Sequence, residues 1–140
     1  MKITIIAVGK IKEKPIQQSI NKFLKRIPIT IIEEKDLNPE REANRILKHI
    51  KNQYVIVCSE EGKEYTSKDF AKHLQTISFE KEIVFVVGGP IGIHDKLKTA
   101  ADEILSLSKM TIPHEMARLF LIEQIYRAQT IIDGKEYHKE

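Results

Sequence analysis

The sequence predicts an α/β fold in which a mostly parallel sheet is covered by helices on both faces. Short runs that are apolar throughout alternate along the chain with longer amphipathic stretches. Strands that are apolar on both sides are typical of parallel sheets, because both faces of such a sheet are buried. The composition is that of an ordinary globular protein, with 41% hydrophobic and 31% charged residues. Because the 140 residues contain no repeat and no linker, we expect residues 1–140 to form a single domain.

The first 58 residues are predicted to contain three strands and two helices. Strands are expected at 3–8, 27–32 and 54–58, where apolar and β-branched residues run together (ITIIAV, IPITII and YVIVC). Helices are expected between these runs, at 15–26 and 40–50. The first helix places its apolar residues on one face, which would pack on the sheet; these residues are Ile16, Ile20, Phe23 and Leu24.

The second half of the chain continues the alternation. Thr66 and Asp69 have the spacing of a helix N-cap, before a helix that contains Phe70, Leu74 and Ile77. The run EIVFVV predicts a buried strand at 82–87, which Gly88-Gly89-Pro90 ends. A helix at 94–101, a strand at 103–108 and a helix at 115–132 follow.

The helix at 115–132 is apolar on nearly every side. One stripe contains Ala117, Leu121, Ile125, Ala128 and Ile132, and other faces carry Leu119, Phe120, Ile122, Tyr126 and Ile131. A helix of this kind is buried on more than one side. In so short a chain we expect the second side to be covered by a partner subunit, which predicts a homodimer.

Ligands of parallel sheets bind at the carboxyl ends of the strands, so the loops after Val8, Cys58, Val87 and Ser106 are the candidates. The first loop contains only Gly9 and therefore lacks the glycine pattern of a dinucleotide site. The segment GGPIG at 88–92 lacks the lysine and hydroxyl of a phosphate loop. Its two glycines either form a simple turn or let a ligand lie against bare backbone.

Charge, cysteine and histidine usage exclude several classes. The net charge is +3, but residues 1–51 contain 12 Lys/Arg against 6 Asp/Glu, whereas the remainder contains 11 against 14. This imbalance fits solvated helix faces and is weak support for a nucleic-acid partner. The single cysteine, Cys58, excludes an internal disulfide and favours a cytoplasmic location. The five histidines show no metal-ligand spacing, although His114 is placed to cap a helix or line a pocket.

Membrane and signal segments are not expected. No apolar run approaches the roughly 20 residues that a membrane span needs. The N-terminal MKITIIAVGK is interpreted as a first strand rather than a signal peptide. Arg118 stands out for another reason, because it is a charged residue among apolar neighbours.

Three ordered motifs resemble a known family. FVVGGPIGI, LSLSKMTIPHEMARLFLIEQIYRA and the ending GKEYHKE, with MKITIIAVGKIKEK at the N-terminus, resemble the RlmH family of SPOUT-class methyltransferases of bacterial large-subunit ribosomal RNA. The resemblance implies the SPOUT (α/β-knot) fold with a C-terminal trefoil knot, an exception to the rule that chains do not thread loops. It also implies a cytoplasmic homodimer that uses S-adenosyl-L-methionine to methylate N3 of a pseudouridine in 23S ribosomal RNA in the ribosome. No DNA, membrane or metal is expected to take part.

The resemblance also assigns candidate residues. Contacts to the cofactor are implied at Cys58, Gly88, Leu107, Ser108, Lys109, Met110, Thr111 and Ile112, and the family usually has leucine where this chain has Cys58. Our own candidates near the reacting base are Arg118, which would orient the substrate or a phosphate, and Tyr137 with His138 from the tail. The chain is short for the family, and the missing residues are expected around 34–42.

Two alternatives remain open on the sequence alone. One is a ribosome-associated RNA-binding protein without turnover, which would have no use for S-adenosylmethionine. The other is a SPOUT methyltransferase that modifies tRNA. The weakly basic N-terminal half does not distinguish between RNA substrates.

Overall fold

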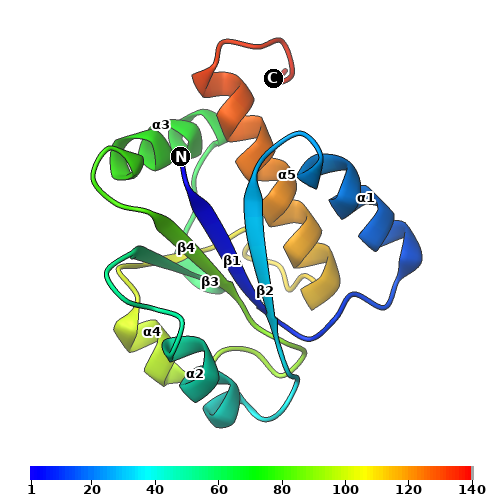
Figure 1. The fold of residues 1–140 in the computed structure, drawn as a ribbon, viewed down its shortest axis with the longest axis vertical. Helices are drawn as coiled ribbons and strands as arrows, with labels where there is room; N and C mark the ends of the chain where they lie inside the picture. The colour runs from blue at the N-terminus through cyan, green and yellow to red at the C-terminus, as the bar shows by residue number, and fades with distance from the viewer. Residues whose placement is uncertain (140) are drawn as a thin grey trace.

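A computed structural model describes residues 1–139 and contains one five-stranded sheet with every strand pair parallel (Figure 1). The strand order is β2-β1-β4-β3-β5. The strands are β1 (Ile3–Val8), β2 (Ile29–Glu34), β3 (Tyr54–Lys63), β4 (Ile83–Val87) and β5 (Glu103–Leu105). This arrangement confirms the predicted α/β class, while the trefoil knot stays a prediction.

Helices cover both faces of the sheet, as predicted. They are α1 (Lys14–Leu24), α2 (Pro39–Leu47), α3 (Ser67–Ser78), α4 (Asp95–Ala100) and α5 (His114–Ile132). Helices α1, α3 and α5 pack on one face, and α2 and α4 pack on the other (Figure 1). None of the helices within residues 1–139 combines the length and apolarity needed to cross a membrane.

Two hydrophobic cores result from this layering. Alternate residues of one strand enter opposite cores, as Ile5 and Ile6 of β1 and Phe85 and Val86 of β4 do. Because β1 and β4 lie inside the sheet and are buried on both faces, their runs are apolar throughout. This explains why a run without alternation predicted these two strands correctly.

Three strands differ from the prediction by two residues or more at one end or both. The second strand runs from 29 to 34 rather than 27 to 32, because the N–H of Ile27 donates to the carbonyl of Phe23 and still belongs to the turn that follows α1. The fifth strand ends at Leu105 rather than at 108. The third strand continues five residues beyond Cys58, through the polar segment SEEGK.

The extension of β3 lies against β5 at Gly62. A methyl group on Gly62 would lie 2.4 Å from the carbonyl oxygen of Ile104, which no side chain tolerates. The N–H of Ser106 then donates to the carbonyl of Lys63 at 2.9 Å. A polar run with one glycine carries no apolar signal, so the prediction ended this strand early.

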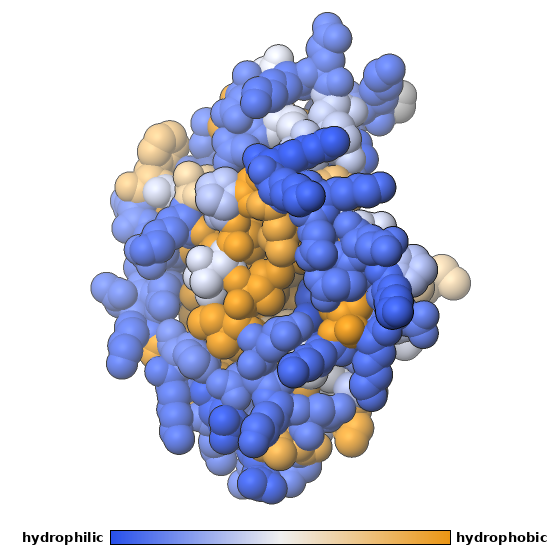
Figure 2. Space-filling view, turned by 45° about the vertical axis from the view of Figure 1, so that its right-hand side comes forward, coloured by the Kyte–Doolittle hydropathy of each residue, from blue (hydrophilic) through white to orange (hydrophobic). Residues whose placement is uncertain are grey.

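Helix α5 is buried within one chain to a larger extent than its sequence suggested. Leu121, Ile122 and Ile125 are fully buried in the core that α5 shares with α1, α3 and the sheet. The neighbouring helices of the same protomer therefore cover much of the apolar surface that the sequence led us to expect under a partner subunit. Met116 and Phe120 remain exposed, at 52% and 41%. Apolar side chains also reach the surface on the side of the molecule that carries α1 (Figure 2).

Candidate functional site

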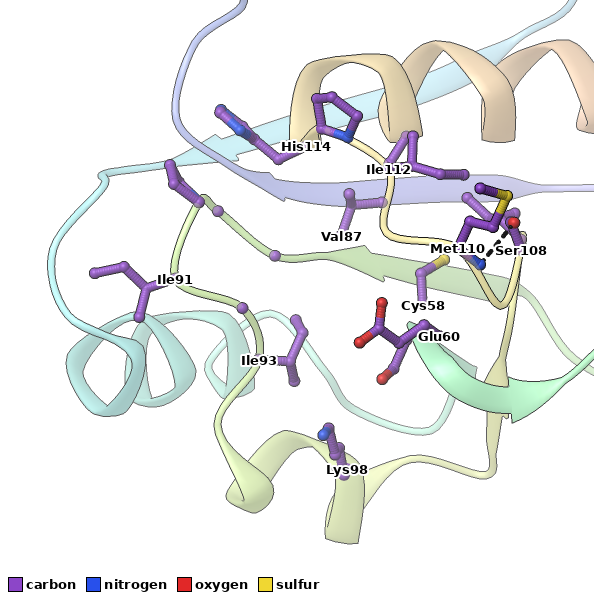
Figure 3. A pocket seen from close by; sticks show the side chains of 18 residues that line it. Cys58, Glu60, Val87, Ile91, Ile93, Lys98, Ser108, Met110, Ile112 and His114 are labelled. Carbon is purple, nitrogen blue, oxygen red and sulfur yellow. Dashed lines mark hydrogen bonds between the residues drawn. The ribbon is translucent and has the colours of Figure 1, made fainter.

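A cavity of about 520 Å³ opens at the carboxyl edge of the sheet (Figure 3). Its walls come from the end of β3, the loop after β4, the segment after β5 and the first turn of α5. The lining residues include Cys58, Glu60, Gly88, Ile93, Lys98, Leu107, Ser108, Met110, Ile112 and His114. Three of the four candidate loops thus meet at one place, as expected for a parallel sheet.

The glycines after β4 are needed for packing beside the cavity. A methyl group on Gly88 would approach the Cδ1 atom of Ile93 to 2.8 Å, and one on Gly89 would approach Cγ1 of Val8 to 2.9 Å. Gly88 and Ile93 both line the cavity. The loop therefore folds back so that Ile93 occupies the space beside the bare backbone of Gly88, and a larger residue at 88 would push Ile93 into the cavity.

The segment after β5 is held by short-range bonds. Ser108 Oγ accepts from the N–H of Met110 at 3.0 Å, drawn as a dashed line in Figure 3. Thr111 Oγ1 donates to Glu60 Oε2 at 3.1 Å, which connects this segment to the extension of β3. The carboxylate of Glu60 is shown in Figure 3 beside Cys58 at the edge of the cavity.

Cys58 contributes a neutral group. Burial raises the pKa of the Cys58 thiol to about 12, because the charged thiolate would be poorly solvated there. At neutral pH the side chain is therefore an uncharged, apolar part of the wall rather than a nucleophile.

Six of the eight residues implied as cofactor contacts line the cavity, namely Cys58, Gly88, Leu107, Ser108, Met110 and Ile112. Lys109 and Thr111 do not. The Lys109 ammonium is 3.8 Å from Glu64 Oε1 and largely exposed, and Thr111 bonds to Glu60 as described above. Sequence reasoning missed Glu60, Ile93 and Lys98, and only the extension of β3 beyond Cys58 would have pointed to Glu60.

Arg118 lies outside this cavity and lines a smaller one with Gln17 and Glu33. Its side chain is 3% exposed, and its guanidinium donates to Glu33 Oε2 at 2.6 Å and to the carbonyl of Gly9 at 2.8 Å. A weaker contact reaches the carbonyl of Val8 at 3.4 Å. These partners explain how an arginine is accommodated among apolar neighbours.

The tail residues Tyr137 and His138 are also separated from the cavity within one chain. Tyr137 donates to Glu123 Oε2 at 2.9 Å, its ring lies 4.8 Å from that of Tyr126, and His138 Nδ1 is 3.1 Å from Arg127. These contacts fix the tail on the C-terminal part of α5, whereas His114 at the first residue of α5 lines the cavity. The two places are roughly 18 Å apart along the helix axis.

Residues 1–139 contain no group of three or more His, Cys, Asp or Glu side chains arranged to hold a metal ion. The titratable side chains that line the cavity are those of Cys58, Glu60, Lys98 and His114.

The sequence was compared with known proteins, and it is similar to methyltransferases over nearly its whole length. A family model described as "Predicted SPOUT methyltransferase" matches residues 1–138. A "Ribosomal RNA large subunit methyltransferase H" of Prochlorococcus marinus (strain NATL1A) is 46% identical over 138 residues, covering 97% of this chain and 94% of that protein. A protein of the same name from Streptococcus uberis is 41% identical and covers 99% and 100% of the two chains. That alignment runs over 159 positions, so this chain lacks residues that the relative has.

Solved structures of lower identity share the fold. A methylase family protein of Neisseria gonorrhoeae is similar with a TM-score of 0.61 at 13% identity, covering 99% of this chain and 86% of that one. The SpoU methyltransferase AviRb of Streptomyces viridochromogenes, solved in complex with the cofactor AdoMet, has a TM-score of 0.52 at 10% identity over 96% of this chain and 59% of that one. The family model and the full-length relatives together show that this chain belongs to the SPOUT methyltransferase family.

Proposed function

We propose that this protein transfers a methyl group from S-adenosylmethionine to N3 of a pseudouridine in the 23S ribosomal RNA of the large subunit. The observation that carries the proposal is the cavity at the carboxyl edge, which gathers six of the implied contact residues in a chain that belongs to the SPOUT methyltransferase family. Full-length relatives named for methylation of large-subunit ribosomal RNA support the choice of substrate.

The cavity suits a nucleoside ligand. A volume of about 520 Å³ lies in the range of small-molecule sites, and the lining offers both apolar and polar groups. Ile93, Leu107 and Ile112 supply apolar wall for a base, and the Gly88-Gly89 backbone supplies amide groups. Glu60 supplies a carboxylate for an amine, and Lys98, which is paired with Glu61 at 2.7 Å, supplies an ammonium group.

S-adenosylmethionine, when bound, supplies a methyl group already activated on a sulfonium. The residues of the chain therefore have to position the base in line and accept the N3 proton. Glu60 and His114 are the lining side chains with an oxygen or nitrogen atom that could serve as the base, because the raised pKa of Cys58 keeps its thiol protonated.

We further propose that the active form is a homodimer in which the tail of one protomer reaches the cavity of the other. The tail and the cavity lie at opposite ends of α5, so a second copy that packs along α5 would bring them together. The exposed apolar side chains of Met116 and Phe120 on α5 support a contact there. In a two-fold symmetric pair, both cavities would be completed in the same way.

Calorimetry with S-adenosylmethionine and transfer of its labelled methyl group to ribosomes test the proposal. The ribosomes come from cells that lack this gene, and purified tRNA is the control substrate. The proposal is supported if the protein binds the cofactor and methylates ribosomes but not tRNA. Methylation of tRNA alone would identify a different substrate, and ribosome binding without cofactor binding would identify a binding protein without turnover.

A further inference from the structure

We propose that the loop between β1 and α1, Lys10 to Lys14, binds phosphates of the RNA backbone beside the mouth of the cavity. The inference rests on the proposed function, since it assigns a surface for the RNA that the cavity would methylate. Its basis is a set of exposed lysines on a loop that α5 holds in a fixed place next to the cavity.

The first anchor of this loop is Glu115. The backbone N–H groups of Lys12 and Glu13 both donate to Glu115 Oε1, each at 3.0 Å. The N–H of Glu13, together with that of Lys12, lowers the pKa of Glu115, so the carboxylate is charged at neutral pH. Glu115 directly follows His114, which lines the cavity. The loop therefore lies against the edge of the cavity that α5 forms.

The second anchor is the buried side chain of Arg118. It donates to the carbonyl of Gly9 at 2.8 Å, at the point where the chain leaves β1 with a φ of 83° at Gly9. A positive φ favours glycine, which permits the sharp turn that directs the loop toward α5. Arg118 and Glu115 lie on one turn of α5, so one turn of one helix fixes both ends of the loop.

Glu115 and Arg118 both bond to backbone atoms, those of Lys12, Glu13 and Gly9, so the lysine side chains stay exposed. Lys10, Lys12 and Lys14 are exposed, and within residues 1–139 none of their ammonium groups is paired with a carboxylate. On the other side of the cavity, Lys98 is 2.7 Å from Glu61 and Lys109 is 3.8 Å from Glu64. Of these lysines, those of the loop are therefore the ones without a carboxylate partner in the described part of the chain, and Glu13 is the one carboxylate inside the loop.

The positive surface continues along α1. Lys22 and Lys25 are exposed. Lys25, directly after α1, is close to three whole turns from Lys14, and Lys22 is about 80° around the helix axis from Lys14. A strand of RNA with a base in the cavity would therefore meet successive ammonium groups along this loop and helix. Phosphates are the groups that such a row of lysines attracts, with a strong dependence on salt. The excess of basic residues in the first 51 positions is explained by this surface in part.

The test compares two triple variants with the same net charge. Lys10→Gln/Lys12→Gln/Lys14→Gln removes the proposed phosphate contacts and leaves the backbone bonds to Glu115 in place. Lys48→Gln/Lys51→Gln/Lys81→Gln is the control, because these lysines are also exposed and Lys51 and Lys81 precede β3 and β4 at the opposite edge of the sheet. Circular dichroism and S-adenosylmethionine affinity should be unchanged in both variants.

The readouts are the affinity for unmethylated ribosomes, measured without the cofactor, and KM and kcat for methyl transfer. The loop variant should raise Kd and KM about tenfold or more, with little change in kcat. It should also lower the slope of log Kd against log salt by about 2, at roughly 0.7 per contact to a single strand. Equal affinity and slope in the loop variant and the wild type would overturn the inference, and so would equal losses in both triple variants. Absence of methyl transfer by the wild-type protein would instead reject the proposed function, because the affinity measurement does not depend on turnover.

Discussion

At the scale of single residues, Gly62 shows how a polar stretch can be part of the framework. The space that its side chain would fill is taken by the carbonyl of Ile104, 2.4 Å from the position of a methyl group. Gly62→Ala forces β3 and β5 apart. We expect the free energy of unfolding, measured in urea, to fall by about 1 to 3 kcal/mol. An unchanged midpoint and slope would show that the two strands separate easily at this point.

Glu42 predicts a dependence of stability on pH. Its buried carboxyl accepts from the N–H of Leu37 at 2.8 Å, and burial, with the nearby Asp36, raises its pKa. The folded state therefore holds this proton more tightly than the unfolded state does. The protonated carboxyl contributes fully to stability at pH values below the ordinary pKa of a glutamate. This contribution is lost as the pH rises through the raised pKa of the folded state.

Glu42→Gln removes this titration while keeping an oxygen that can accept from Leu37. The thermal midpoint of the variant should fall less than that of the wild type as the pH rises from about 4.5, the usual value of a glutamate, toward neutrality. Glu40→Gln, an exposed change in the same helix, is the control. Parallel curves for the wild type and Glu42→Gln would contradict the account.

Cys58 is a packing residue of the cavity wall in this account. Because its thiol is neutral and apolar, leucine should serve in its place, as is usual in the family that the sequence resembles. Cys58→Leu is expected to bind S-adenosylmethionine within a few-fold of the wild-type affinity. A loss of binding by calorimetry, in a variant that remains folded, would mean that the sulfur makes a specific contact.

At the scale of elements, the strands and the helices were predictable from their hydrophobic patterns. A strand buried on both faces is apolar throughout, and a helix buried on one face has its apolar residues at helical spacing. The loops at the carboxyl edge followed from the parallel sheet alone. The extension of β3 was not predictable from its polar sequence, and Glu60 was missed with it. The engagement of Arg118 by Glu33 depends on residues 85 positions apart, which no local pattern encodes.

The tail is the element whose role is most open to test. Tyr137 is held by Glu123 and covers Tyr126, and His138 bonds to Arg127. Truncation after Lys135 should therefore cost about 1 to 3 kcal/mol of stability from two hydrogen bonds and one ring contact. Methyl transfer to ribosomes should fall sharply, while S-adenosylmethionine affinity is retained. Wild-type rates in the truncated protein would show that the tail only covers the end of α5.

At the scale of the whole molecule, the structure changes the choice of residues for testing a dimer. Charging Leu121 or Ile125, which are fully buried in one chain, would unfold the protein rather than separate subunits. Phe120→Glu introduces charge on the exposed side of α5, and Phe79→Glu at the end of α3 is the control at an 80% exposed position. Light scattering should show dimers for the wild type and the control and monomers for Phe120→Glu. A monomeric wild type at micromolar concentration would contradict the proposed assembly.

The proposed reaction brings together the cavity, a methyl donor and a base in the large-subunit RNA. Mass spectrometry of 23S ribosomal RNA from cells without this gene, complemented with the wild type or with Gly88→Val, tests it most directly. The Gly88→Val side chain would displace Ile93 into the cavity, so it should block the cofactor. We expect an N3-methylated pseudouridine to disappear on deletion, to return with the wild type and to stay absent with the variant. A methylation pattern unaffected by deletion would contradict the account.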